Sequence, residues 1–256
     1  MATPSSTTIL FVPGAWHSPT CYAKLLAPLE SAGYTTTLIH LPTVNPNANP
    51  DTAPPSFAAD VQAIRSAIIQ AADAEQNILL VVHSYGGIPA SEAVRDLDLA
   101  SRAKRGLRGG VSHLFYCCSF LIPKGQSLVS ALGGAELPWL SISADKSIVH
   151  ALTPETIFYN DMSPADVEAA IRELRPHAYA SFSGTVTYEA WRDVPTTYLY
   201  CLQDAAVPIE VQRMLVGEFA AGAGIRTVTV DAGHSPFYSV PGEVVRAIRR
   251  AGGEDV

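Results

Sequence analysis

The residues of this chain best suited to chemistry are a serine, an aspartate and a histidine, each placed after an apolar run. Ser84 follows the run Ile78–Val82 in the stretch ILLVVHSYGG, and Asp204 and His234 follow two later runs. A serine hydroxyl is a weak nucleophile that needs a base to take its proton and an acid to orient that base. In chain order the three residues supply nucleophile, acid and base, which predicts acyl transfer at a serine.

The surroundings of Ser84 are typical of a nucleophile elbow, a tight turn between a buried strand and a helix that presents the serine hydroxyl. Gly86 and Gly87 follow the serine, and we expect a side chain there to strike a neighbouring strand or helix. The usual pattern is G-x-S-x-G, whereas Val82 takes the place of the first glycine here. The pattern alone would also fit a serine in an ordinary strand-to-helix loop.

Each of the other two candidates also has a structural alternative. Asp204 would suit the start of the helix that Pro208 opens, because acidic residues favour helix N-termini. Asp231 is a rival acid, although it lies too close in sequence to His234 to orient it easily. His83 is expected to point away from the neighbouring nucleophile and to pack in the core. No matching position at a strand end is found for the remaining histidines, His17, His40, His113, His150 and His177.

Acyl transfer also needs hydrogen-bond donors for the oxyanion that develops on the substrate, and backbone N–H groups suffice. One candidate is the amide of Tyr85, directly after the nucleophile at a helix start. The other is the amide of Ala15, in the turn after the first apolar run, where Gly14 lets the backbone approach closely. This turn could equally do no more than end the strand.

The elements that must position these residues alternate as strands and amphipathic helices. We expect buried strands at 8–12, 34–41, 78–82, 111–118, 196–202 and 225–230. We expect helices at 22–29, 57–68, 88–97, 208–219 and 241–249. Such an α/β pattern predicts a mostly parallel, doubly wound sheet with helices on both faces. The carboxyl ends of its strands then share one edge, where ligands bind in such sheets.

The alternation lapses between residues 119 and 194, with short helical pieces near 164–174. We therefore expect residues 1–118 and 195–256 to form one α/β core, and residues 119–194 to form an inserted, mainly helical cap. The cap is rich in apolar side chains, some of which would pack on the core and some of which would line a substrate pocket. The pocket candidates are Trp16, Phe120, Leu121, Trp139, Phe158 and Tyr159.

Composition limits the partners. The 256 residues carry a formal charge of −7, and 48% of them are hydrophobic. The basic stretch 102–108 reads as a solvated loop, so we expect neither nucleic acid nor an anionic membrane as a partner. No apolar run approaches the ~18 residues of a membrane span. The residues suited to acyl transfer instead predict a small apolar carbonyl substrate as the partner. The sequence does not give the oligomeric state, and a homodimer is one alternative.

Cysteine usage and the first residues bear on compartment and cofactors. The stretch 1–8 is polar and lacks a charged n-region, so no signal peptide is visible. Cys21, Cys117, Cys118 and Cys201 have no metal-type spacing and read as small core residues in a reducing compartment. We therefore expect a cytoplasmic protein, and neither a metal nor an organic cofactor is implied.

Four motifs in order, VPGAWH, VVHSYGG, CLQDAAVP and DAGHSPF, resemble the α/β-hydrolase superfamily over essentially the whole chain. The resemblance is closest to the small-cap branch that holds plant-type hydroxynitrile lyases, methyl esterases of the salicylate and polyneuridine-aldehyde kind, and microbial relatives. Residues 157–161 through Trp191 resemble the cap of that branch. The resemblance implies triad roles for Ser84, Asp204 and His234, with Ala15 and Tyr85 at the oxyanion hole.

Departures from the family pattern narrow the range of reactions that the resemblance implies. Pro13 stands where the family's first turn usually has histidine, and Gly14 and Ser235 stand where the lyases carry a threonine and a lysine. Cyanohydrin cleavage is not expected, because no cation is in place to receive cyanide. We expect a serine hydrolase of small-to-medium apolar carboxylic esters, lactones or thioesters. The alternatives are a lyase, cyclase or carbon–carbon bond hydrolase acting on a natural-product intermediate, and a ligand receptor on a hydrolase fold.

Overall fold

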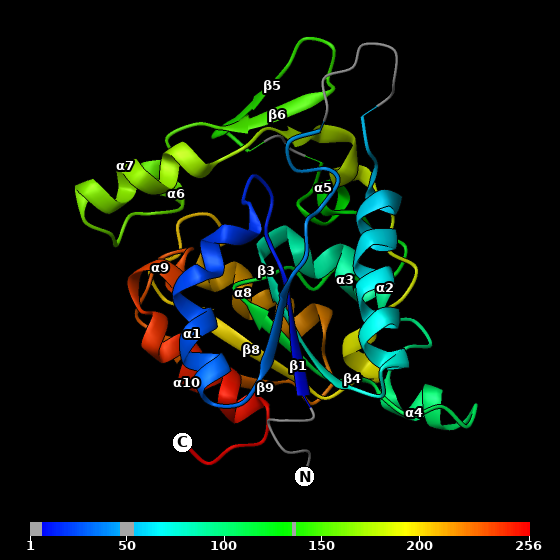
Figure 1. The fold of residues 1–256 in the computed structure, drawn as a ribbon. Coiled ribbons are helices and arrows are strands. Elements are labelled where there is room, and N and C mark those ends of the chain that lie inside the picture. The colour runs from blue at the N-terminus through cyan, green and yellow to red at the C-terminus, as the bar shows by residue number, and fades with distance from the viewer. Residues whose placement is uncertain (1–6, 47–53, 135–136) are drawn as a thin grey trace.

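The computed structural model describes residues 7–46, 54–134 and 137–256, and within them a sheet of six parallel strands forms the centre (Figure 1). The strand order is β2-β1-β3-β4-β8-β9. Their bounds are β1 Thr7–Val12, β2 Thr35–Leu38, β3 Asn77–His83, β4 Gly110–Cys117, β8 Thr196–Cys201 and β9 Arg226–Val230. The predicted fold class is confirmed, although β2 is shorter than the predicted strand 34–41.

Helices lie on both faces of the sheet, as Figure 1 shows. The described α-helices are α1 Ala23–Ser31, α2 Phe57–Asp73, α3 Gly87–Ala93, α4 Leu99–Ala103, α5 Leu128–Ala131, α6 Pro154–Ile157, α7 Pro164–Glu173, α8 Ile209–Met214, α9 Pro236–Ser239 and α10 Pro241–Ala251. Short 3₁₀ helices span Pro19–Tyr22, Ser84–Gly86, Tyr179–Ser183 and Ala190–Arg192, and a π-helical turn spans Leu215–Phe219. None of the described helices has both the length and the apolar character needed to cross a lipid bilayer.

Alternation along the strands builds two hydrophobic layers. In β3, Leu80 and Val82 pack with α2 and α3, whereas Leu79 and Val81 pack with α1 and α10 on the other face. Because successive strand residues point to opposite faces, an uninterrupted apolar run is what a sheet covered on both sides requires. The strand thereby carries the chain through the core and delivers Ser84 at its carboxyl end.

The chain between β4 and β8 forms the structure over that end of the sheet (Figure 1). It holds α5, α6 and α7, and also a three-stranded antiparallel sheet that the sequence pattern does not predict. The strands of this second sheet are β5 Leu140–Ile142, β6 Ile148–Ala151 and β7 His177–Ala178. Strands of two to four residues are too short for alternation to be read. The expectation of a mainly helical cap is therefore incomplete, because the segment also contains this sheet. Its strand β6 contacts the loop after β1.

The basic stretch 102–108 differs in one residue from the solvated loop that we expected. Residues 103–108 are exposed, but Arg102 is buried. Its guanidinium donates to the carbonyl oxygens of Ala72 and Gly109 at 3.1 and 2.9 Å, and to Asp73 Oδ1 at 2.9 Å. Arg102 therefore connects the end of α2 to the turn before β4.

Replacement of Arg102 by alanine should destabilise the fold by about 3 kcal/mol, because two buried carbonyl groups lose a charged donor. Chemical denaturation would measure the change. The control is Lys104→Ala, an exposed neighbour expected to stay within about 0.5 kcal/mol of wild type. Equal stability of the two variants would show that the Arg102 contacts contribute nothing.

Candidate active site

Ser84 lies in the turn between β3 and α3 with a backbone φ of 51°, in the left-handed region that non-glycine residues rarely adopt. The turn is closely packed. A Cβ on Gly86 would lie 2.3 Å from the Pro13 carbonyl oxygen, and one on Gly87 would lie 2.3 Å from Ser119 Oγ. The two glycines are thus required by contact with neighbouring backbone and side chain. A strained serine held in so tight a turn is typical of a nucleophile elbow.

Asp204 and His234 form a buried hydrogen-bonded pair. His234 Nδ1 lies 2.8 Å from Asp204 Oδ2, and Asp204 Oδ1 accepts the backbone N–H groups of Ala206 and Val207, both at 2.8 Å. With its Nδ1 proton donated to the carboxylate, the imidazole has Nε2 free to act as a base. The rival acid Asp231 is exposed and instead accepts from Gln203 Nε2. The structure therefore pairs His234 with Asp204.

Gln212 of α8 holds the loop that carries Asp204. Its Oε1 accepts the Cys201 N–H at 3.1 Å, and its Nε2 donates to the Cys201 carbonyl oxygen at 3.0 Å. The same amide nitrogen donates to the Val207 carbonyl at 2.7 Å and lies 3.5 Å from Asp204 Oδ2. Because Gln212 is fully buried, these bonds fix the turn between β8 and α8 around the carboxylate.

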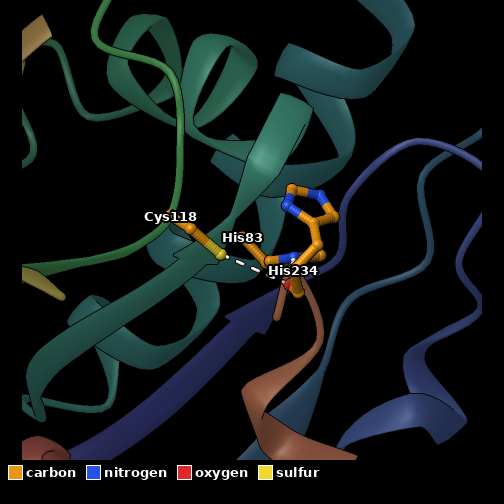
Figure 2. Close-up of side chains that lie close together, drawn as sticks. All are labelled: His83, Cys118 and His234. Atoms are coloured by element: carbon orange, nitrogen blue, oxygen red, sulfur yellow. Dashed lines mark hydrogen bonds between the residues drawn. The ribbon is translucent and has the colours of Figure 1, made fainter. Parts of the chain in front are cut away.

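His83 and Cys118 lie beside His234, as Figure 2 shows. Both hydrogen-bond to the His234 carbonyl oxygen, His83 Nε2 at 2.9 Å and Cys118 Sγ at 3.3 Å, and the two imidazole rings lie 4.6 Å apart. Burial lowers the pKa of His83 well below its usual range, so this ring is neutral. His83 packs in the core as expected, and in addition it fixes the backbone of His234.

Two groups of metal-ligand type side chains occur in this buried region. One is His83, Cys118 and His234, and the other is Cys117, Cys118 and Cys201, with donor atoms within 4.8 Å of one another. In the first group, nitrogens of both histidines already serve the hydrogen bonds to the His234 carbonyl and to Asp204. The second group lies sealed in the core. In the first group, these hydrogen bonds support the backbone and the ring of His234.

The turn after β1 faces Ser84 and is held from the cap. Trp16 adopts φ 64°, and its indole Nε1 donates to the Val149 carbonyl of β6 at 3.0 Å. The indole also packs against Trp139 and Phe158. Ala15 and Tyr85, the two predicted oxyanion donors, line one pocket together with Ser84 and His234. Tyr85 lies in the first turn of a helix, where backbone N–H groups have no intrahelical acceptor.

Two functional contacts were missed from sequence. His17 is buried, with Nδ1 2.8 Å from the Ala15 carbonyl oxygen and Nε2 3.1 Å from the Tyr159 hydroxyl. Asp60 is fully buried and accepts the Tyr85 hydroxyl at 2.8 Å. His17 lies in an irregular turn, and no sequence pattern marks it. Asp60 could have been found from the sequence, because it is an acidic residue within the apolar stripe of α2.

Asp60 also anchors the segment after β2. Its carboxylate accepts the backbone N–H and the hydroxyl of Thr43, at 3.1 and 2.6 Å. Burial raises the pKa of Asp60 to about 6, against the hydrogen bonds from Thr43 and Tyr85, which lower it. Through these contacts α2 fixes the side chain that directly follows the nucleophile.

The pocket above Ser84 is a cavity of about 750 Å³, including its open mouth. Of the predicted pocket residues, four line it: Trp16, Phe120, Trp139 and Phe158. Leu121 and Tyr159 do not line it: Leu121 is fully buried in the core, and Tyr159 is buried with its hydroxyl bonded to His17 Nε2. Further described lining residues are Leu128, Val129, Leu132, Leu137, Leu140, Tyr179, Phe182, Ala206 and Val207.

Comparison with known proteins identifies the family of this chain. The model of the alpha/beta hydrolase family matches residues 9–247. The chain belongs to this family. The alpha/beta hydrolase nvfD of Aspergillus novofumigatus is 32% identical over 251 residues, which cover 97% of each chain. Methylesterase 7 of Arabidopsis thaliana is 24% identical, over 92% of each chain.

Among solved structures, a crystal structure of the pyrethroid hydrolase PytH has a TM-score of 0.76 to this α/β-hydrolase at 20% identity. The match covers 96% of this chain and 97% of that one. At this identity the likeness shows the fold alone. The resemblance to the branch of plant methylesterases, drawn from the four motifs, is confirmed.

The buried histidines of this hydrolase should make its free energy of unfolding decrease as the pH is lowered. Burial lowers the pKa of His17 from 6.5 to about 4. Between these values the unfolded chain binds a proton that the folded chain does not, so acidification favours unfolding. The variant His17→Asn keeps a donor toward Ala15. Its free energy of unfolding should fall less steeply on acidification than that of the wild type, and the two slopes should differ by up to about 1.4 kcal/mol per pH unit.

Denaturation at pH 7, 6 and 5 would measure this slope. Asp60 acts in the opposite direction, since its raised pKa means that the folded chain holds that proton more tightly. It is present in both proteins and cancels from the comparison. An unchanged slope in His17→Asn would contradict the assignment of a neutral His17.

Proposed function

We propose that this protein is a serine hydrolase that cleaves small-to-medium apolar carboxylic esters, lactones or thioesters. The observation that carries the proposal is the placement of Ser84 and His234 on one pocket wall, with His234 held by Asp204 at 2.8 Å. Curated relatives described as hydrolases and methylesterases support the same class of reaction.

In the first half of the reaction, His234 Nε2 takes the Ser84 hydroxyl proton while Oγ attacks the substrate carbonyl carbon. The carbonyl oxygen becomes an oxyanion, which the N–H groups of Ala15 and Tyr85 stabilise. Asp204 holds the imidazole in the required tautomer and stabilises the imidazolium. His234 then gives its proton to the departing alcohol or thiol, which leaves an ester of Ser84.

The second half repeats these steps with water. His234 Nε2 takes a proton from water as the water oxygen attacks the acyl carbon, and the oxyanion forms again at the same two amides. Collapse of this intermediate breaks the bond to Ser84, and His234 returns its proton to the serine oxygen. The products are a carboxylic acid and the regenerated enzyme.

The pocket chemistry favours a neutral, apolar acyl or alcohol group. Its described walls are aromatic and aliphatic side chains, and no Lys, Arg, Asp or Glu occurs among the described lining residues. Burial of apolar surface supplies the binding energy in such a site, and the few polar atoms near Ser84 orient the reacting carbonyl.

Two residues near the pocket argue against cyanohydrin cleavage. Ser235 takes the place of the lysine that the lyases of the resembled branch carry, and its hydroxyl is buried without a hydrogen-bond partner in the described chain. At the other departure, a Cβ on Gly14 would lie 2.9 Å from Ser84 Cβ, so the threonine of the lyases would not fit without movement. These two departures favour hydrolysis over cyanohydrin cleavage.

The first test is activity on a panel of p-nitrophenyl esters and simple lactones. Ser84→Ala should lose at least ~10³-fold in kcat, because only the oxyanion donors and binding remain. A fluorophosphonate should label the wild type and not this variant. The control is Ser66→Ala, an exposed serine of α2, which should match the wild type. Equal turnover in Ser84→Ala would refute the proposal, and a wild type that is labelled but turns over only once would favour a receptor.

Charge on the acyl chain provides a second test. The p-nitrophenyl monoester of succinic acid should show kcat/KM at least ~100-fold below that of p-nitrophenyl valerate, because its carboxylate would be desolvated without a partner cation. Steady-state rates at pH 7.5 measure the ratio. Comparable kcat/KM values would mean that acyl groups do not enter the apolar pocket.

A further inference from the structure

We propose that four consecutive residues, Phe158–Asp161, are positioning residues that align the base, the acid and the oxyanion turn with one another. We call them the FYND segment. The inference rests on the proposed function and assigns to the cap a role beyond covering the pocket. Each of the four side chains contacts a different part of the site.

Phe158 contacts the base directly. Its ring lies 5.6 Å from the His234 ring at an interplanar angle of 33°, and 5.5 Å from the Trp16 indole at 31°. The phenyl ring is buried between the two and also lines the pocket. An apolar ring in this place limits how far the imidazole can rotate away from Asp204.

Tyr159 reaches the oxyanion turn through His17. The tyrosine hydroxyl donates to His17 Nε2 at 3.1 Å, and His17 Nδ1 donates to the Ala15 carbonyl oxygen at 2.8 Å. A neutral imidazole has one donor and one acceptor nitrogen, so both bonds are satisfied in this direction only. The hydroxyl of a cap residue thereby holds, through His17, the carbonyl of Ala15, the residue whose own N–H is a predicted oxyanion donor.

Asn160 and Asp161 hold the two loops that carry the acid and the base. Asn160 Nδ2 donates to the Gln203 carbonyl at 2.8 Å, and Asp161 Oδ2 accepts the Gly233 N–H at 2.7 Å. Gln203 and Gly233 directly precede Asp204 and His234 in the chain. The fit at Gly233 is tight, since a Cβ there would lie 2.4 Å from Asn160 Oδ1.

The need for such a segment follows from topology. The acid and base loops leave neighbouring strands at one side of the sheet. Two backbone bonds join their first residues, from Leu202 N–H to the Val230 carbonyl at 3.1 Å and from Gln203 N–H to the Ala232 carbonyl at 2.9 Å. The oxyanion turn follows β1, which is separated from β8 by the two strands β4 and β3. Phe158–Asp161 is in contact with all three, so displacement of the cap would disturb them together.

The test uses Tyr159→Phe, Asp161→Ala and Asp161→Asn in the full-length chain. Tyr159→Phe and Asp161→Ala should each lower kcat by about 10- to 100-fold on a p-nitrophenyl ester and leave KM within threefold, because misplacement by about 1 Å has effects of this size. Asp161→Asn should recover most of the loss, since its amide oxygen can still accept the Gly233 N–H.

The matched control is Asp145→Asn. Asp145 is also a cap aspartate that accepts a backbone N–H, from Ser147 at 3.0 Å, but it lies in the turn between β5 and β6 away from the acid and base loops. It should keep the wild-type kcat. The proposal is wrong if Tyr159→Phe and Asp161→Ala stay within twofold of wild-type kcat, or if KM rises while kcat is unchanged.

A measurement without turnover separates this inference from the proposed function. The proton between His234 Nδ1 and Asp204 should give a far-downfield ¹H NMR signal, assigned by its loss in Asp204→Ala. It should shift or broaden in Asp161→Ala and not in Asp145→Asn, even if the wild type cleaves no ester. If Asp161→Ala fails to fold by circular dichroism, kcat of Tyr159→Phe decides. An unmoved signal in a folded Asp161→Ala would overturn the inference.

Discussion

The hydrogen bond between His234 and Asp204 is the interaction on which the rest of the site depends. Both partners are buried, so an ionised carboxylate must be compensated there by donors. Ala206, Val207 and His234 supply them, and Gln212 fixes the backbone around them. Many of the polar contacts in this part of the molecule therefore compensate and orient the buried carboxylate of Asp204.

The second constraint is the crowding around Ser84. The left-handed φ of the serine stores strain, and the glycines that follow let the turn pack onto Pro13 and Ser119. Strain of this kind persists only where neighbours over-determine the conformation. Here β1, β3 and β4 all contribute, since Ser119 Oγ donates to the Ser84 carbonyl at 2.6 Å just after β4.

The sequence predicts the sheet well, because buried strands are marked by strong local patterns. Parallel strands must end on one edge, which is why the sequence places Ser84, Asp204 and His234 at that edge. The catalytic roles of these three residues stay a prediction. His17 and Asp161 could not be found in this way. They lie in irregular segments and act through single hydrogen bonds to backbone, which leave no periodicity. The small sheet of the cap was missed because its strands of two to four residues are too short for an alternation to be recognised.

The indole of Trp16 belongs to the core sequence but donates its hydrogen bond to β6 of the cap. The two parts of the chain are therefore not interchangeable modules. A cap transplanted from a relative would have to bring a carbonyl to the position of Val149 and a hydroxyl to that of Tyr159, or the turn that bears Ala15 would lose its support. Substrate range in this scaffold should thus evolve by substitution within the existing cap more readily than by exchange of the whole segment.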